Sequence, residues 1–278
     1  MVANIGDYAT TYERFDWETP ERFNFGRDAV DGWDDDRPAM IWLGEGGEER
    51  RLTFGDFSRL SNRFANAMRN AGVGRGDRVM VLLGKVPEWH AILTGLLKLG
   101  AIAIPCAPQL RSGDLKFRAE HSGSVAMISG PEGIGQVEKM RRDTPSLKRF
   151  VCVGEENEGR ESFEDLVDGA SKDSAAEGTA SDDGAFILYT SGTTKNPKGV
   201  LHTHGYTHAK RVQARFWLDL QEGDRLWCTS GTGWAKSIWN VFLGPWSLGT
   251  EIFFHEGGFD PAERLDLIER YYAITVLC

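Results

Sequence analysis

A run of hydroxyl, glycine and lysine residues between two apolar stretches is the part of the sequence best equipped for chemistry. Residues 188–200 read LYTSGTTKNPKGV. Backbone N–H groups around a glycine can enclose phosphate oxygens, and hydroxyl groups donate hydrogen bonds to the same oxygens. A lysine adds a compact positive charge. These residue types in this order indicate a loop that binds phosphate.

The charge distribution around this loop favours a bound anion. The whole chain of 278 residues has a formal net charge of −9, yet residues 184–218 contain no Asp or Glu. A local positive field in an acidic protein is typical of an anion site. The alternative is a Ser/Thr-rich surface turn with incidental lysines, because such residues are common in turns. The basic residues of this window are Lys195, Lys198, Lys210, Arg211 and Arg215.

The loop differs from the two best-known phosphate motifs. Counted from Gly192, a Walker A loop requires glycine at position 197 and Ser or Thr at position 199. The chain has Pro197 and Gly199 instead. No G-x-G-x-x-G sequence opens a helix here, so the dinucleotide-binding motif is excluded as well.

Residues 190–200 resemble the TSGTTGxPKGV signature of the adenylate-forming superfamily, which comprises acyl-CoA synthetases, peptide-synthetase adenylation domains and luciferases. Residues 97–105 (LKLGAIAIP) and 74–79 (GRGDRV) are similar to early elements of that superfamily. The resemblance extends from about residue 10 to the end of the chain. Three further segments look most like the medium-chain acyl-CoA synthetase branch: 232–234 (TGW), 245–249 (PWSLG) and 259–261 (FDP).

The resemblance implies a two-step reaction. A carboxylate attacks the α-phosphate of ATP to give an acyl-adenylate and pyrophosphate, and the thiol of CoA then displaces AMP. Mg²⁺ shields the phosphates in the first step. The expected small molecules are therefore ATP, Mg²⁺, CoA and a carboxylic acid. Medium-chain fatty acids and aromatic acids both fit.

The resemblance also implies which residues bind the nucleotide. Lys195 replaces the glycine of the family signature, which reduces backbone freedom in a loop that is expected to move. Its ammonium would add a phosphate contact, or the change would weaken ATP binding, and both interpretations stay open. The residues expected at the β- and γ-phosphates or beside them are Thr190, Ser191, Gly192, Thr193, Thr194, Lys195, Asn196, Pro197 and Lys198.

Trp234 is the candidate for the acyl pocket, by resemblance to the medium-chain branch. The competing interpretation is that Trp234, Trp239 and Trp246 are core aromatics, because large aromatic side chains usually serve packing.

Three histidines form an H-x-H-x-x-x-H array over residues 202–208. A zinc site is one interpretation, but no fourth ligand is evident. The favoured interpretation is that His204 packs beside the nucleotide loop.

Alternating strand and helix patterns predict an α/β fold of mostly parallel sheets flanked by helices. We expect an irregular N-terminal segment (1–36), a first α/β subdomain (37–168), an acidic linker or loop (169–184) and the beginning of a nucleotide-binding α/β region (185–278). Within these ranges, Thr53 and Asp56 form a capping-box pattern, Pro87 is placed to begin a helix, and Asp260 with Pro261 is placed to begin another.

Composition excludes several classes of protein. The acidic balance and the sequence pI of about 5.3 argue against a general nucleic-acid binder. No apolar run reaches the roughly 18–20 residues that span a bilayer, so no transmembrane segment is expected. The first 36 residues lack the pattern of a targeting peptide. Four scattered cysteines without a C-x-x-C indicate reduced core thiols and a cytoplasmic location.

The end of the chain favours an incomplete enzyme. Residues 274–278 read as the first part of a buried strand, whereas a terminus usually lies at the surface. The family's adenine and Mg²⁺ segment, ribose-binding Asp, hinge, late lysine and C-terminal lid domain are not found. We therefore expect an N-terminal fragment of an acyl-CoA synthetase that is inactive alone and ends at Cys278.

Two other functions stay open at this stage. An adenylation domain would transfer its acyl group to a carrier protein rather than to CoA, and the Trp-rich segment 232–261 favours CoA. A non-catalytic, degenerate relative would bind nucleotide or a partner without catalysis, and Lys195 and the missing C-terminal half favour it.

Overall fold

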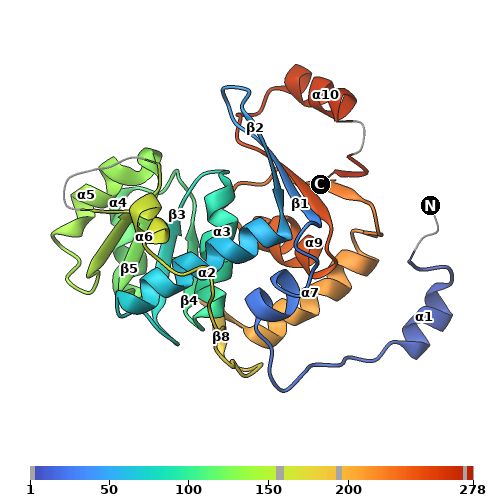
Figure 1. Cartoon of the computed structure of the whole chain (residues 1–278), viewed down its shortest axis with the longest axis horizontal. Coiled ribbons are helices and arrows are strands. Elements are labelled where there is room, and N and C mark those ends of the chain that lie inside the picture. Colours follow the sequence, from blue (N-terminus) through green and yellow to red (C-terminus); the bar gives the residue numbers. More distant parts are fainter. Residues whose placement is uncertain (1–3, 155–159, 192–195, 272–273, 278) are drawn as a thin grey trace.

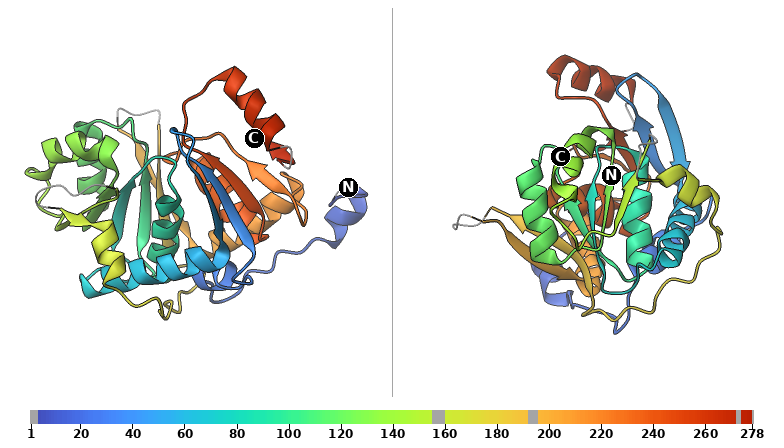
Figure 2. Two further views of the ribbon diagram at one scale, coloured as in Figure 1. Left: turned by 45° about the horizontal axis from the view of Figure 1, so that its top comes forward. Right: turned by 90° about the vertical axis from the view of Figure 1, so that its left-hand side faces the viewer.

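The computed structural model describes residues 4–154, 160–191, 196–271 and 274–277. Two mainly parallel sheets lie side by side with helices between and outside them (Figures 1 and 2). The α/β class with mostly parallel sheets, predicted from the sequence, is confirmed.

The larger sheet has seven strands in the order β7-β6-β5-β3-β4-β8-β9. All its neighbouring strands are parallel except β8 and β9, which form an antiparallel pair. The bounds of the strands are β3 Arg78–Leu82, β4 Ile102–Cys106, β5 Ala126–Ser129, β6 Arg149–Cys152, β7 Glu161–Ser162, β8 Gly184–Thr190 and β9 Lys198–Thr203.

The smaller sheet has five strands in the order β12-β10-β11-β1-β2. Here β1 and β2 are antiparallel, and the other neighbours are parallel. The bounds are β1 Pro38–Leu43, β2 Glu49–Thr53, β10 Arg225–Trp227, β11 Glu251–His255 and β12 Val276–Leu277.

The helices form three layers around the two sheets. The largest core cluster unites side chains of both sheets with those of α2, α3, η3 and α9, so these helices lie between the sheets. Helices α4 and α5 cover the outer face of the seven-stranded sheet, and α10 covers the outer face of the five-stranded sheet. The bounds are α1 Tyr8–Arg14, η1 Gly26–Val30, α2 Phe54–Asn70, α3 Pro87–Lys98, α4 Ser112–Ser122, η2 Pro131–Gly133, α5 Ile134–Arg141, α6 Phe163–Asp168, α7 His204–Phe216, α8 Ala235–Ser237, η3 Ile238–Leu243, α9 Gly244–Ser247 and α10 Pro261–Arg270.

Helix α3 is buried on all sides, apart from a half-buried Glu88. This burial follows from its composition, since a helix that is apolar all round belongs inside a protein. Pro87 occupies its first turn as expected. The Thr53–Asp56 capping box of α2 is also confirmed, with the Asp56 amide donating to Thr53 Oγ1 and the Thr53 amide to the Asp56 carboxylate. Asp260 caps α10.

The expected ranges 37–168 and 185–278 each contribute strands to both sheets. The strands β1 and β2 pair with the late strand β11, whereas β8 and β9 join the early strands through β4. The order of the segments along the sequence did not indicate these pairings, because the partners of parallel strands are determined by long-range packing. Whether those ranges behave as domains stays a prediction.

The N-terminal segment differs from the irregular structure expected over residues 1–36. It contains α1 and the single π-helical turn η1. The buried Lys98 ammonium donates to the Asp31 carboxylate at 2.6 Å and to Asn62 Oδ1 at 2.7 Å, and so ties the end of η1 to α2 and α3. A polar segment is therefore ordered here by one buried cation.

Residues 169–183 cross the surface without a helix, as expected of a linker or loop. They are nevertheless tied down. The side-chain amide of Asn66 in α2 donates to the carbonyls of Ser171 and Asp173. The backbone amide of Glu177 donates to the carbonyl of Lys98 at 2.7 Å. These bonds fix the segment against the helices between the sheets.

Candidate functional site

The loop predicted to bind phosphate joins β8 to β9 at the edge of the seven-stranded sheet. The two strands pair in register up to Thr190 and Lys198. The inner strand β8 is largely buried, whereas Lys198 to Leu201 of β9 are exposed. Figure 2 shows this hairpin projecting from the sheet in its right-hand view. A hydroxyl residue, Thr190, and a lysine, Lys198, therefore face each other where the two strands end.

The structure describes part of the predicted phosphate site. Thr190, Ser191, Asn196 and Lys198 are exposed, and Pro197 is half-buried. Gly192, Thr193, Thr194 and Lys195 lie outside the described residues. The described donors, two hydroxyl groups and one ammonium, suit an anion such as phosphate.

A cluster that the sequence analysis did not identify lies at the base of this hairpin. The Tyr189 hydroxyl is 2.9 Å from His121 Nδ1 and donates to the Arg118 carbonyl at 3.3 Å. The Arg118 guanidinium lies 5.1 Å from the centre of the Tyr189 ring. Burial raises the pKa of Tyr189. The cluster fixes the end of β8 on α4, and no motif in the sequence pointed to it.

A cavity of about 410 Å³ opens where strands of both sheets end. Its lining comes from segments that follow the carboxyl ends of β3, β4, β10 and β11, together with one residue of α10. Ligands of open α/β sheets bind outside these strand ends. The lining residues are Gly84, Lys85, Pro108, Gln109, Thr229, Gly231, Thr232, Trp234, Glu256, Gly257, Gly258, Phe259 and Arg264.

The predicted loop and this cavity lie at the same edge of the seven-stranded sheet. Strand β8, which leads into the loop, is parallel to β4, and β4 is parallel to β3. The carboxyl ends of all three strands therefore point the same way. The described end of the hairpin and the cavity therefore lie on the same side of the seven-stranded sheet.

Close backbone packing positions the loop that carries Trp234. A Cβ on Gly233 would lie 2.0 Å from the Ala107 amide nitrogen, so this loop rests directly on the segment after β4. The Thr232 hydroxyl donates to the Leu83 carbonyl after β3, and the Ser237 hydroxyl donates to the Gly231 carbonyl at 2.7 Å. The two sheets are thus joined at the cavity by loop contacts.

Arg264 of α10 holds the opposite wall of the cavity. Its guanidinium donates to the carbonyls of Gly257 and Gly258 and lies 2.6 Å from His255 Nδ1. Burial and the nearby Arg264 charge lower the pKa of His255, which keeps the imidazole neutral and able to accept this hydrogen bond. The arginine therefore fixes the loop after β11.

Two further charged side chains line the cavity. Burial and the Arg264 charge lower the pKa of Lys85, whose ammonium donates to the Thr229 carbonyl at 3.1 Å. Burial, and after it the nearby carboxylates, raises the pKa of Glu256. The cavity therefore combines an aromatic wall with cations and one carboxyl group.

The three tryptophans considered from the sequence have different environments. Trp246 is fully buried, Trp239 is half-buried, and Trp234 is 65% exposed beside the cavity. The core interpretation is therefore right for Trp246 and wrong for Trp234. An exposed indole at a cavity is available to a ligand, and the assignment of Trp234 to an acyl pocket stays a prediction.

The histidine array does not form a metal site in the described part of the chain, where no cluster of three His, Cys, Asp or Glu side chains is placed to hold a metal ion. His204 is the first residue of α7 and is completely buried, and burial lowers its pKa to about 4. His202 lies on β9 with its ring 4.3 Å from that of Tyr206. If Mg²⁺ takes part, it would be held mainly by phosphate oxygens and water, as is usual for this ion.

The basic residues of the 184–218 window do not gather at the hairpin. Lys198 is there, but Lys210 of α7 lies between the rings of Tyr206 and Trp239, at 4.3 and 4.5 Å from their centres. Arg211 and Arg215 line a separate cavity beside α1. Sequence proximity thus overstated the positive charge at the loop, because a helix distributes its side chains over several faces.

In the described part of the chain, no helix combines the length and apolar character required to cross a membrane.

Comparison with known proteins gives one consistent family. The AMP-binding enzyme family matches residues 27–278. Human mitochondrial acyl-coenzyme A synthetase ACSM3 is 34% identical, over 99% of this chain and 49% of its own length. The chain spans about half the length of the curated relatives it matches.

Two solved structures share the fold. A Brucella canis acyl-CoA synthetase superposes with a TM-score of 0.88 at 25% identity, over 97% of this chain and 51% of its own. The anthranilate CoA ligase AuaEII in complex with anthranoyl-AMP superposes with a TM-score of 0.82 at 25% identity, over 91% of this chain and 49% of its own. With a family match over most of its residues, the chain belongs to the AMP-binding enzyme family.

Proposed function

We propose that this chain supplies the phosphate-binding hairpin and the acid-binding cavity of an acyl-CoA synthetase. The observation that carries the proposal is the common edge of β3, β4 and β8, which directs the hairpin and the Trp234 cavity to one side of the molecule. Relatives named acyl-coenzyme A synthetases match nearly the whole chain, which supports CoA rather than a carrier protein as the acceptor.

In this proposal the hairpin binds the β- and γ-phosphates of ATP. Thr190 and Ser191 donate hydrogen bonds from their hydroxyl groups, and Lys198 contributes its ammonium. Gly192, Thr193, Thr194, Lys195, Asn196 and Pro197 complete the loop. Mg²⁺ would neutralise the phosphates when it is bound. Exposed donors on an edge hairpin can close over a nucleotide without disturbing the sheet.

The cavity would hold the carboxylic acid, with the Trp234 indole against its apolar part. The carboxylate attacks the α-phosphorus, the bond to the bridging oxygen breaks, and pyrophosphate leaves. The CoA thiol then displaces AMP and forms the thioester. The volume of about 410 Å³ falls within the range of about 300–1,000 Å³ that is usual for small-molecule pockets. Medium-chain and aromatic acids both fit the proposal.

We further propose that the 278-residue chain does not complete the reaction alone, since its curated relatives are about twice as long. For the compartment, the sequence interpretation is cytoplasmic, although the human relative is named as mitochondrial. Cys106, Cys152 and Cys228 are buried, as the sequence interpretation of core thiols expects.

The test is carboxylate-dependent ATP–pyrophosphate exchange, measured with the product of the whole native reading frame and with residues 1–278. Exchange by the former with octanoate or benzoate, together with thioester formation from CoA, supports the proposal. Nucleotide binding without exchange by the complete product would favour a non-catalytic relative. Acyl transfer to a carrier protein but not to CoA would favour an adenylation domain.

A further inference from the structure

A second cavity lies between α1 and α7. Its volume is about 490 Å³, and three arginines, Arg14, Arg211 and Arg215, line it together with Asn4, two threonines and apolar side chains. No Asp or Glu is part of this lining. In a protein with a net charge of −9, three cations around one cavity without a carboxylate indicate an anion site.

These arginines lack a direct carboxylate partner in the described part of the chain, although the Glu18 carboxylate acts on Arg211 from a distance. Among the described residues, none of the three forms an ion pair with a carboxylate. Arg211 donates instead to the Glu18 carbonyl and to His208, and Arg215 lies with its guanidinium 5.4 Å from the centre of the Phe216 ring. Some other arginines are paired with carboxylates, for example Arg75 with Asp183 at 2.7 Å, whereas Arg37 and Arg78 donate to backbone carbonyls. The cavity therefore keeps its positive charge available.

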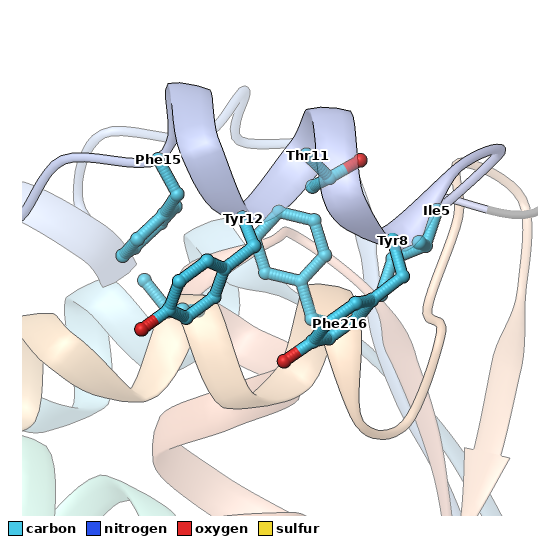
Figure 3. Close-up of a pocket in the computed structure, with 7 residues that line it drawn as sticks. Ile5, Tyr8, Thr11, Tyr12, Phe15 and Phe216 are labelled. Carbon is cyan, nitrogen blue, oxygen red and sulfur yellow. The ribbon is translucent and has the colours of Figure 1, made fainter.

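An apolar pocket of about 180 Å³ adjoins this cavity and shares four of its residues, Thr11, Phe15, Val212 and Phe216. Figure 3 shows the side chains of Tyr8, Tyr12 and Phe15 projecting from α1 toward α7 and Phe216. The rings of Tyr8 and Tyr12 are stacked at 5.8 Å and remain 69% and 71% exposed. Large exposed aromatics at a pocket indicate a binding surface rather than core packing.

The two cavities are held in place at both ends of α1. The Asn4 side chain donates to the Arg215 carbonyl in the last turn of α7, and to the Asp219 carboxylate at 2.8 Å and the Leu220 carbonyl beyond its end. At the other end of α1, the Phe15 and Phe216 rings meet edge to face at 5.9 Å. The short helix α1 is therefore attached to α7 near both of its ends. The two cavities between the helices are open to a ligand.

We propose that the α1–α7 site binds an anionic amphiphile, with its apolar tail against Tyr8, Tyr12 and Phe216 and its anionic head among Arg14, Arg211 and Arg215. The ligand class is a short alkyl chain that ends in a phosphate or carboxylate. Because α7 follows β9 directly, a ligand that fastens α1 to α7 acts on the helix that continues the proposed phosphate hairpin. The proposal does not depend on the proposed function.

Octyl phosphate is the probe, because its head is no substrate for acyl transfer. Isothermal titration calorimetry with residues 1–278 compares it with octanol, which has the tail alone, and inorganic phosphate, which has the head alone. We expect octyl phosphate to bind at least about tenfold more tightly than either, since the two parts occupy adjoining cavities. Equal affinity for inorganic phosphate, equal affinity for octanol, or no binding of octyl phosphate would each overturn the proposal.

Variants assign the binding to this site. The double variant Arg14→Gln/Arg215→Gln should weaken octyl phosphate by about tenfold or more, because each arginine loses a charge-assisted hydrogen bond. The control Arg142→Gln, on the α5 side of the molecule, should leave the affinity unchanged. The variant Tyr8→Ser/Tyr12→Ser should weaken octyl phosphate but not inorganic phosphate. Equal effects of the arginine double variant and its control would contradict the site.

Tyr8, Tyr12, Arg14 and Arg215 are exposed, so we expect these variants to keep the parent's melting temperature. Differential scanning calorimetry measures that temperature directly. Vesicles with anionic lipid form a separate arm. If vesicles bind while monomeric octyl phosphate does not, the surface is a membrane contact and the proposed pocket is wrong.

Discussion

Gly233 lies against the backbone of Ala107 so closely that a Cβ at position 233 would be 2.0 Å from the Ala107 amide nitrogen. This contact joins the loop after β10, in the five-stranded sheet, to the segment after β4, in the seven-stranded sheet. The next residue is Trp234, which lines the cavity. The position of the indole therefore depends on the absence of a side chain one residue earlier.

The variant Gly233→Ala is expected to displace this loop, because backbone atoms cannot move aside as a flexible side chain can. Overpacking of this kind costs about 1–3 kcal/mol of the free energy of unfolding. Urea denaturation of residues 1–278 measures it. The control Gly135→Ala lies in α5 with open space around its Cβ and should be neutral or slightly stabilising. Equal stabilities of the two variants would contradict the close packing.

Truncation of Trp234 and of Trp246 to alanine should have very different effects on stability. Trp234 is 65% exposed, so Trp234→Ala should change the free energy of unfolding by less than about 0.5 kcal/mol and should reduce affinity for the carboxylic acid in the complete protein. Trp246 is fully buried among aromatic rings, so Trp246→Ala should cost about 3–5 kcal/mol. Denaturation curves measure the stability of each variant, and calorimetry measures its affinity for the acid. A large stability loss for Trp234→Ala would show that Trp234 is a core residue.

Local patterns predicted the fold well wherever the decisive interaction is local. The Thr53–Asp56 cap, Pro87 in the first turn of α3 and Asp260 as the N-cap of α10 each depend on residues within one helical turn. The helix at residues 8–14 was missed because α1 buries none of its residues, so no apolar stripe marks it. The strand order was equally inaccessible, since β1 pairs with β11 across more than 200 residues.

The candidate site was predictable in part for the same reason. The hairpin loop is a continuous signature, and the strands on both sides of it are where the sequence indicated. The cavity is assembled from the ends of four strands and one helix, so Lys85, Glu256 and Arg264 could not be identified from spacing. Arg211 and Arg215 were attributed to the phosphate loop, whereas the turn of α7 directs them to another cavity.

Lys98 should be one of the most sensitive positions for stability. Its side chain is completely buried, and its ammonium contacts Asp31 and Asn62. The variant Lys98→Met removes the charge-assisted hydrogen bonds to Asp31 and Asn62 and should cost about 1.5–3 kcal/mol in unfolding free energy, because the partly exposed Asp31 carboxylate regains water. The double variant Lys98→Met/Asp31→Leu should recover much of that loss in a double-mutant cycle. Strictly additive effects would show that the pair does not couple.

Acid should destabilise the fold partly through His90, which is surrounded by Phe57, Trp246 and Phe254. Burial lowers its pKa from 6.5 to about 3. The unfolded chain therefore takes up a proton below about pH 6.5 while the folded state does not until about pH 3. Stability conferred by the neutral ring is complete above pH 6.5 and is lost as the pH falls through this window, at about 1.4 kcal/mol per pH unit for one proton.

The variant His90→Phe removes this proton uptake. Between pH 6.5 and 5, its urea midpoint should fall less steeply than that of the parent, with a difference of about 2 kcal/mol in the loss of free energy. Phe163→Leu, a change in the core beside Phe64, removes no titrating group and should keep the parent's slope. If His90→Phe also kept that slope, the imidazole would take up its proton equally in the folded and the unfolded chain, and its pKa would not be lowered by burial.

Lys198 tests the phosphate hairpin itself. Its side chain is exposed on the edge strand β9, opposite Thr190, and among the described residues it forms no ion pair. The variant Lys198→Ala should therefore leave stability within about 0.5 kcal/mol of the parent, since no internal contact is lost. Loss of one charge-assisted contact should weaken tripolyphosphate or ATP binding by about tenfold.

Calorimetric titration of residues 1–278 with tripolyphosphate at two salt concentrations measures this effect. The variant's affinity should also vary less with salt, because one fewer cation is screened. Lys172→Ala, an exposed lysine in the 169–184 segment, is the matched control and should bind as the parent does. A Lys198→Ala variant with the parent's affinity would remove the hairpin lysine from the proposed site and leave phosphate binding to the hydroxyl and backbone groups of the loop.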